Sequence, residues 1–423
     1  MSKINKNIIN LDYREFTLNN GLKVVMSANK KIPVLTVNST FHIGSKDEDE
    51  NKTGLAHLFE HLMFEGSENV EKGKFDEILN SNGGDSNAYT SWDITSYHIS
   101  IPSNKLELAL WLDSGRIAGF RIDNESLEIQ KKVVLEEKLQ VHDNTPYGSV
   151  EAESSKRLFQ NSGYKSPIIG NMKHLEKVDL NDINDFFKMY YVPRNMVLSV
   201  VGDIKYDETE NMIKKYYENI PPGKYIERKP YDESEILSEN RDTLFDDVNL
   251  PGKFYFYRIP KSGTREYYIS HLISAMLTEG DSSRLYTNLV YDKQLLNEVD
   301  SAVYGMEDVS LFNINSIIME GADINDIENG IDDELNNIKE GKFTDDEIFK
   351  VKNRIITKYI MKLQTNNNLA DKFSEIRTFY PDCSKINNEI NEYDDITKSE
   401  IADFASQYLD KKKRVVLNYL PRE

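Results

Sequence analysis

Two histidines and a glutamate lie close together near the N-terminal end of the chain. His57 and His61 are four positions apart, and Glu60 lies between them. On an α-helix, side chains four positions apart lie on one face, so both imidazoles could bind one metal ion. Glu60 could then face a water molecule at that ion, which is the geometry of a general base. The alternative interpretation is a pair of hydrogen-bonded core histidines beside a glutamate.

The residues around this segment predict a buried helix over 53–64. Its apolar face would consist of Leu55, Leu58, Leu62 and Met63. Burying two imidazoles and a carboxylate without partners would cost free energy, so the pattern favours a metal site over an unpaired cluster.

A third ligand is predicted on a second helix, over residues 125–142. Apolar residues recur every seven positions and mark its expected buried stripe: Leu127, Val134 and Val141. Gln130 and Glu137 fall on the same stripe, and a carboxylate there needs a cation or hydrogen-bond donors. We therefore predict Glu137 as the third ligand in preference to Glu136, which lies about 100° away around the helix. A salt bridge at the helix edge is the alternative role for Glu137.

The composition restricts the kind of site and of partner. Cys383 is the single cysteine, so any metal must be held by His, Asp and Glu. This donor set suits one Zn²⁺ ion per chain. A net charge of −19 argues against nucleic acid as a partner. The sequence shows no membrane segment and no secretory signal, so we expect a cytoplasmic protein.

A weak internal repeat predicts two related domains in tandem. Residues 182–186 read DINDF and residues 400–404 read EIADF, and Tyr190 matches Tyr408 at the same offset of 218 positions. A stretch rich in proline and charge lies between the two copies and is typical of a linker. The expected division is a first domain over residues 1–222, a linker over 223–244 and a homologous second domain over 245–423.

Strand and helix patterns are mixed within each half. Asn19-Asn20-Gly21 separates two β-prone runs and predicts a hairpin. Residues 34–44 alternate like a strand with one solvent-exposed face, and residues 104–118 predict a further helix. The expected fold class is α+β, with two tandem homologous α/β sandwich domains.

Several stretches resemble the pitrilysin/insulinase family of inverted zinc metallopeptidases. The stretches GLAHLFEHLMFEGSE (54–68) and KKVVLEE (131–137) are similar to the family's H-x-x-E-H helix and to its second metal-binding helix. In this family the third ligand follows the second histidine by roughly seventy to eighty positions, and Glu137 follows His61 by 76. Further matches lie at residues 83–98, 142–148, 193–204 and 282–295.

The resemblance implies a two-domain subunit, like those of processing peptidases, that forms half of a clamshell around a peptide. The zinc would be held by His57, His61 and Glu137 in a zinc-binding catalytic domain over residues 1–222, and the homologous domain over 245–423 would be metal-free. The strand that carries Asn87, Ala88, Tyr89 and Thr90 would lie at a sheet edge beside the zinc, where an extended peptide could pair with it. Ordinary strand packing is the alternative role for these residues.

Two departures from the family pattern affect the implied site. A second acidic residue often lies seven positions before the metal glutamate, and here that position is Gln130, which could still orient a ligand by hydrogen bonding. The family's Arg and Tyr, which assist at the reacting carbonyl, align with Val290 and Asn297, and neither can replace an arginine.

The resemblance therefore implies a zinc metalloendopeptidase subunit that acts on peptides or unfolded segments. A related chain carrying the Arg/Tyr pair would complete it as a heterodimer. The alternatives are a non-catalytic scaffold subunit and a peptide-binding module.

Overall fold

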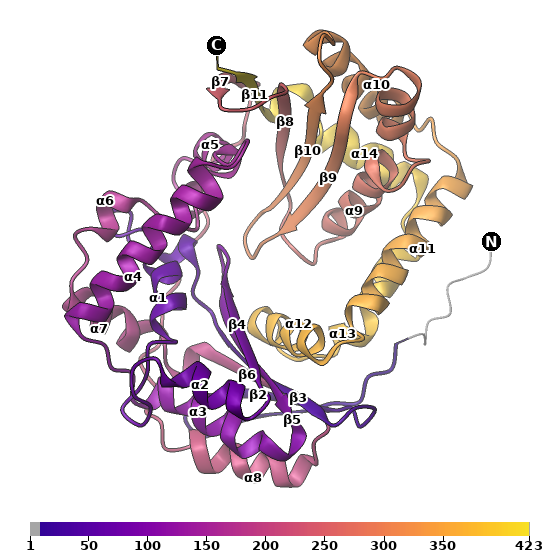
Figure 1. The fold of residues 1–423 in the computed structure, drawn as a ribbon. Coiled ribbons are helices and arrows are strands. Elements are labelled where there is room, and N and C mark those ends of the chain that lie inside the picture. Colours follow the sequence, from indigo (N-terminus) through magenta and orange to yellow (C-terminus); the bar gives the residue numbers. More distant parts are fainter. Residues whose placement is uncertain (1–8, 423) are drawn as a thin grey trace.

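The computed structural model describes residues 9–422, which form two lobes, each built on one β-sheet (Figure 1). The first sheet has six strands in the order β1 (Arg14–Thr17), β2 (Lys23–Ala28), β6 (Met196–Gly202), β3 (Val34–Phe41), β5 (Thr95–Pro102) and β4 (Asp85–Thr90). The second has five, in the order β7 (Asn240–Asp246), β11 (Arg414–Pro421), β8 (Gly252–Ile259), β10 (Ser310–Ile318) and β9 (Leu296–Gly305). β4 and β9 are therefore edge strands.

The two sheets have the same connectivity once β1 is set aside. The pair β2–β6 is parallel, as is β7–β11. The pairs β6–β3, β3–β5 and β5–β4 are antiparallel, and so are β11–β8, β8–β10 and β10–β9. The prediction of two tandem homologous α/β sandwich domains in an α+β fold is confirmed, as is the hairpin formed by β1 and β2.

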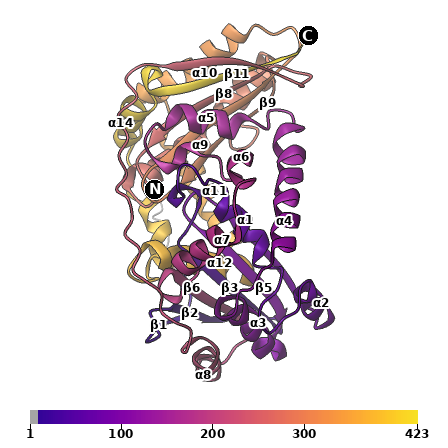
Figure 2. The same ribbon diagram turned by 90° about the vertical axis from the view of Figure 1, so that its left-hand side faces the viewer.

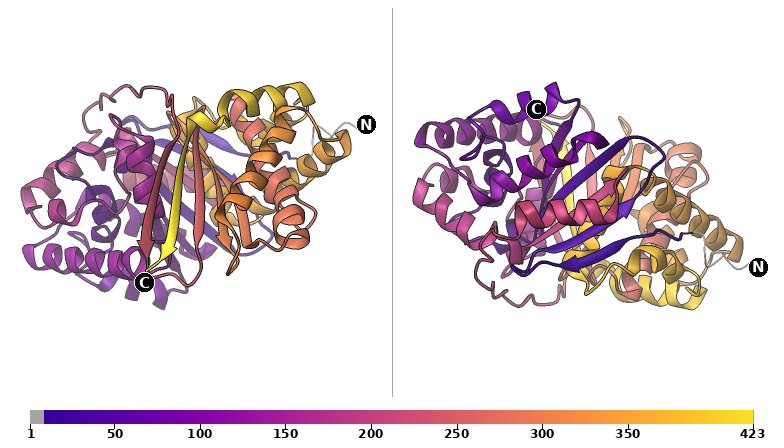
Figure 3. Two further views of the ribbon diagram at one scale, coloured as in Figure 1. Left: turned by 90° about the horizontal axis from the view of Figure 1, so that it is seen from above. Right: turned by 90° about the horizontal axis from the view of Figure 1, so that it is seen from below.

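One face of each sheet is covered by helices from its own half of the chain. The helices that pack on the first sheet are α1 (Leu55–Leu62), α2 (Lys74–Ser81), α3 (Leu106–Ala118), α4 (Asn124–Glu137), α6 (Met172–Leu175), α7 (Leu180–Tyr190) and α8 (Tyr206–Tyr217). Those on the second are α9 (Arg265–Thr278), α10 (Ile324–Lys339), α11 (Asp345–Lys362) and α14 (Lys398–Tyr408). The lobes lie side by side in the views from above and below (Figure 3).

The other face of each sheet is covered by a helix from the opposite half. Helix α12 (Asn366–Phe379), followed by α13 (Lys385–Asn388), packs on β3 and β6 of the first sheet. Helix α5 (Val150–Leu158) packs on β8 and β11 of the second. Figures 1 and 2 show this exchange, with α5 beside β8 and α12 beside β6.

The exchange corrects one expectation about β3. Apart from Val34, the strand is buried on both faces, so the predicted solvent-exposed face is wrong. The polar residues that suggested it lie under α12 and hydrogen-bond neighbouring side chains: Thr36 pairs with Ser100, and Asn38 and Thr40 pair with Ser96.

The segment between the lobes is attached to its surroundings. Strand β7 begins at Asn240, inside the stretch expected to be a linker. The Glu233 carboxylate accepts hydrogen bonds from the backbone N–H groups of Gln160, Asn161 and Ser162. None of the helices within residues 9–422 is both long and apolar enough to span a membrane.

Candidate functional site

Gly54 is the N-cap residue of helix α1, and the Glu48 carboxyl group accepts hydrogen bonds at this end of the helix. Gly54 has a φ of +95°, and a Cβ there would lie 2.9 Å from the carbonyl oxygen of Ile169, so other residues would be strained. The Glu48 carboxylate accepts hydrogen bonds from the N–H groups of Gly54 at 2.8 Å and Ala56 at 2.7 Å. Glu48 thereby fixes the start of the helix. Its burial raises its pKa to about 8 in spite of these bonds.

Helix α1 holds both histidines on one face, as the spacing predicts. It is largely buried, and His57 is 8% exposed. The His57 and His61 rings lie 5.0 Å apart between centroids. Both rings are directed toward the end of α4.

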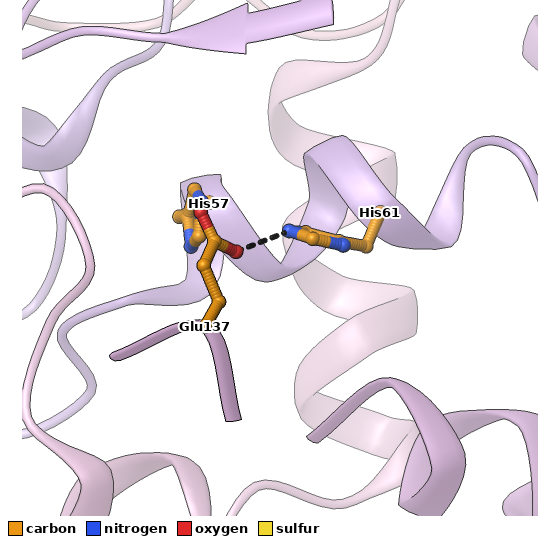
Figure 4. Close-up of side chains that lie close together, drawn as sticks. All are labelled: His57, His61 and Glu137. Carbon is orange, nitrogen blue, oxygen red and sulfur yellow. Dashed lines mark ion pairs between the residues drawn. The ribbon is translucent and has the colours of Figure 1, made fainter. Parts of the chain in front are cut away.

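Glu137 is the last residue of α4, and its carboxylate lies between the two imidazoles (Figure 4). Its oxygens are 3.6 Å from Nε2 of His57 and 3.2 Å from Nε2 of His61. One ligand atom from each of these three residues lies within 4.8 Å of the other two. Glu136 is exposed and instead accepts a hydrogen bond from Gln140.

The second helix differs from its prediction at its C-terminal end. After Glu137 the chain forms a π-helical turn, Lys138–Asp143, rather than further α-helix. Leu127 and Val134 are buried as expected, but Val141 is 52% exposed, so its assignment to the buried stripe is wrong. The wider turn changes the angle between successive residues and ends the seven-residue periodicity.

The donor set fits a zinc ion. Two imidazole nitrogens and one carboxylate oxygen leave a fourth tetrahedral position open, as in catalytic sites. Burial, and then the neighbouring His57, lower the pKa of His61, which favours the neutral imidazole that a metal needs. The neighbouring His57 is the main cause that lowers the pKa of Glu137, so the carboxylate is charged. Nδ1 of His57 is buried and has no hydrogen-bond partner among the residues described.

Glu60 lies on the same helix but outside this group of three. It is half-buried, and its Oε2 accepts a hydrogen bond of 2.6 Å from the Thr90 hydroxyl. Thr90 ends the edge strand β4, so the candidate base is linked to that strand.

Strand β4 is exposed at alternate positions, and one of these, Tyr89, attaches it to α12. Tyr89 donates a hydrogen bond of 2.8 Å to Asp371 of α12. Burial raises the pKa of Asp371. The N–H of Ala88 donates to Oδ1 of Asn87, its own neighbour, at 2.8 Å.

The other residues that the sequence analysis singled out lie outside the group formed by His57, His61 and Glu137. Nε2 of Gln130 donates to Glu65 at 2.6 Å, and within residues 9–422 it makes no hydrogen bond to the three clustered side chains. Val290 packs partly buried against the second core, in the π-helical turn Tyr286–Asp292. Asn297 is exposed on β9. Arg284 is no substitute for the missing arginine, because its guanidinium pairs with Glu347.

Sequence reasoning missed two contributors to the site. Glu48 carried no clear signal, because a carboxylate six residues before the N-cap residue is not at a usual capping position. Asp371 carried no sequence signal either, because it is 282 positions away from its partner Tyr89.

Comparisons with known proteins agree with this architecture. Residues 23–172 match the family described as "Insulinase (Peptidase family M16)", and residues 177–355 match "Peptidase M16 inactive domain". Zinc protease PqqE of Helicobacter pylori is 27% identical over 408 residues, which cover 94% of this chain and 90% of that protein.

Two solved structures extend the comparison. The crystal structure of a protease from Helicobacter pylori has a TM-score of 0.92 at 26% identity and covers 97% of this chain and 100% of its own. The periplasmic protease PqqL from Escherichia coli has a TM-score of 0.82 at 20% identity, and the match covers 97% of this chain but 48% of that one. By its sequence and its two-lobed fold, the chain belongs to the insulinase family of peptidases, family M16.

Proposed function

We propose that this chain is the zinc-bearing subunit of a metalloendopeptidase that hydrolyses peptides or unfolded segments. The observation that carries the proposal is the convergence of His57, His61 and Glu137 beside Glu60 and the edge strand β4. A scaffold subunit would not need Glu60, a carboxylate that lies next to the three proposed metal ligands and is not one of them.

The residues of the site have distinct roles in this proposal. His57, His61 and Glu137 would hold the ion, which when bound polarises a peptide carbonyl and acidifies water. Glu60 takes a proton from the attacking water and passes it to the leaving amine.

The edge of β4 supplies the expected place for a substrate. Asn87, Ala88, Tyr89 and Thr90 lie on a strand with one unpaired edge, and an extended peptide can add to such an edge through its backbone. Backbone pairing is available only to segments without folded structure, which supports unfolded chains as the substrate class. Gln130, next to Glu65, would help to hold α4 against the end of α1.

A related partner chain would complete the active site as a heterodimer. The Arg/Tyr positions hold Val290, partly buried against apolar side chains, and Asn297, so this chain does not supply the charged donor. The match to about half of the longer PqqL chain supports the idea that a subunit of this size is one of two halves. The cytoplasmic location expected from the sequence stays a prediction.

The proposal is tested with purified chain and a quenched-fluorescence peptide library. We would compare wild type, wild type with o-phenanthroline, Glu60→Gln, and the exposed control Glu68→Gln, each with and without a candidate partner that carries the Arg/Tyr pair. We expect one zinc per chain in all untreated samples. Cleavage should fall at least about 100-fold in Glu60→Gln, remain in Glu68→Gln and depend on the partner.

The outcomes separate the proposal from its alternatives. If the untreated samples bind one zinc ion per chain and no sample cleaves peptides, the scaffold or peptide-binding interpretation would be favoured. Cleavage unaffected by the partner would contradict the heterodimer and leave the peptidase.

A further inference from the structure

The backbone of β4 shows which residues face its free edge. The N–H of Ala88 bonds to the Asn87 side chain and not to β5. In an antiparallel pair, residues whose backbone groups point away from the partner recur at every second position. Ser86, Ala88 and Thr90 therefore present their backbone groups to the side where an added strand would lie.

The same residues direct their side chains toward the metal-binding helix. Ser86, Ala88 and Thr90 are half-buried, whereas the alternate residues are exposed, and α1 packs against this strand. Only Thr90 in this set reaches α1 with a hydroxyl, and it donates to Oε2 of Glu60 at 2.6 Å.

The Glu60 carboxylate has little else to hold it. Among residues 9–422, the Thr90 hydroxyl is its one side-chain hydrogen-bond partner, and no ion pair fixes it. A glutamate has three rotatable side-chain bonds, so an unheld carboxylate would occupy several rotamers. A hydrogen bond to a charged acceptor is strong enough to select one of them.

We propose that Thr90 is a positioning residue that links substrate pairing to the general base. Its hydroxyl holds one oxygen of Glu60 so that the other is free to accept the proton. Its backbone lies at the edge to which the peptide adds, so the strand that aligns the scissile bond also orients the base. This inference rests on the proposed function, and it makes Thr90 more than a part of the substrate edge.

The test replaces the hydroxyl and keeps the shape. Thr90→Val removes the donor, Thr90→Ser retains it, and Thr243→Val serves as a control on the exposed edge strand β7 of the second lobe. Each would be assayed with any partner required. We expect Thr90→Val to lower kcat by about 10- to 100-fold, with KM within about threefold and bound zinc unchanged. Thr90→Ser should recover most of the rate, and Thr243→Val should match wild type.

A second measurement does not depend on activity. Crystal structures of zinc-loaded wild type and Thr90→Val would show whether the Glu60 carboxylate moves. We expect one ordered position bonded to Thr90 in the wild type, and a changed or split rotamer in the variant. An unmoved Glu60 in Thr90→Val would overturn the inference, as would a Thr90→Ser variant that is as slow as Thr90→Val or a loss of zinc in Thr90→Val.

The two measurements separate this inference from the proposed function. If wild type and Glu60→Gln both bind zinc and neither cleaves peptides, the proposed peptidase fails. The crystal structures then still decide whether Thr90 holds Glu60.

Discussion

Glu136 and Glu137 are adjacent in the sequence but have different contacts. Glu137 reaches both imidazoles, whereas Glu136 is exposed and bonds Gln140. Since the periodicity of one helix distinguished them, the pair offers a matched test of the predicted ligand.

Glu137→Gln should lower zinc affinity by at least about 100-fold, because an amide supplies no negative charge to the ion. Glu136→Gln should leave affinity unchanged. Competition with a fluorescent chelator and elemental analysis would measure both. Equal loss in the two variants would mean that general charge near the site, and not ligation, determines the affinity.

Glu48 gives the protein a predicted pH dependence. Its folded-state pKa is about 8, against an ordinary value of 4.5. Between these values the folded chain keeps a proton that the unfolded chain releases, so stability falls as pH rises through this window. The fall is at most about 1.4 kcal/mol per pH unit.

Glu48→Gln should remove that contribution, since the amide does not titrate. Thermal unfolding midpoints measured from pH 5 to pH 8 should therefore decline less in this variant than in wild type. Glu50→Gln, exposed two positions away, is the control and should follow wild type. A variant that declines in parallel with wild type would contradict the buried, protonated carboxyl.

The sequence predicts the role of a residue where the pattern that marks it lies within a single helix. His57 and His61 follow from the geometry of one turn of helix, and Glu137 from the stripe of another. Val141 was misassigned because nothing in the sequence marked the π-helical turn. The bond from Tyr89 to Asp371 joins residues 282 positions apart in the chain, and the pattern of a single sequence does not reveal such pairs.

At the scale of elements, β4 is an edge strand, and its outward backbone groups face the side where a peptide would add in the proposed function. Because outward groups alternate, a bound peptide must also bond through alternate residues. Backbone N-methylation should therefore weaken binding by about tenfold or more at every second position of the peptide, and little at the positions between.

A peptide series with a single N-methyl group at each position would test this by calorimetry on zinc-loaded Glu60→Gln, with the partner present if one is required. The unmethylated peptide is the control. Uniform losses along the series would argue that side-chain pockets, and not strand addition, hold the substrate.

Strand β3 shows why an element can be predicted while its surroundings are not. The strand predicted over residues 34–44 begins correctly at Val34, but it ends at Phe41. Its polar positions predicted a solvent-exposed face, because polar residues are mostly exposed in folded proteins. They are instead satisfied by serines on β5 beneath a helix that comes from the other half of the chain.

At the scale of the whole molecule, the repeat predicted two similar domains but not the exchange between them. Helix α12 lies in sequence between α11 and α14, which both belong to the second lobe, yet it packs on the first sheet. Its Phe373 is fully buried in a cluster with Val25, Val197 and Val201. The stability of the first lobe should therefore depend on a helix from the second half of the chain.

Phe373→Ala should cost about 3–5 kcal/mol, and the loss should appear in the lobe on which α12 packs. Hydrogen exchange followed by mass spectrometry should show faster exchange in β2 and β6, with β8 and β10 little changed. Phe349→Ala, on α11 and 44% exposed, is the matched control and should alter neither sheet. Faster exchange confined to the second sheet would show that α12 stabilises its own half, and that the two lobes are joined without sharing their cores.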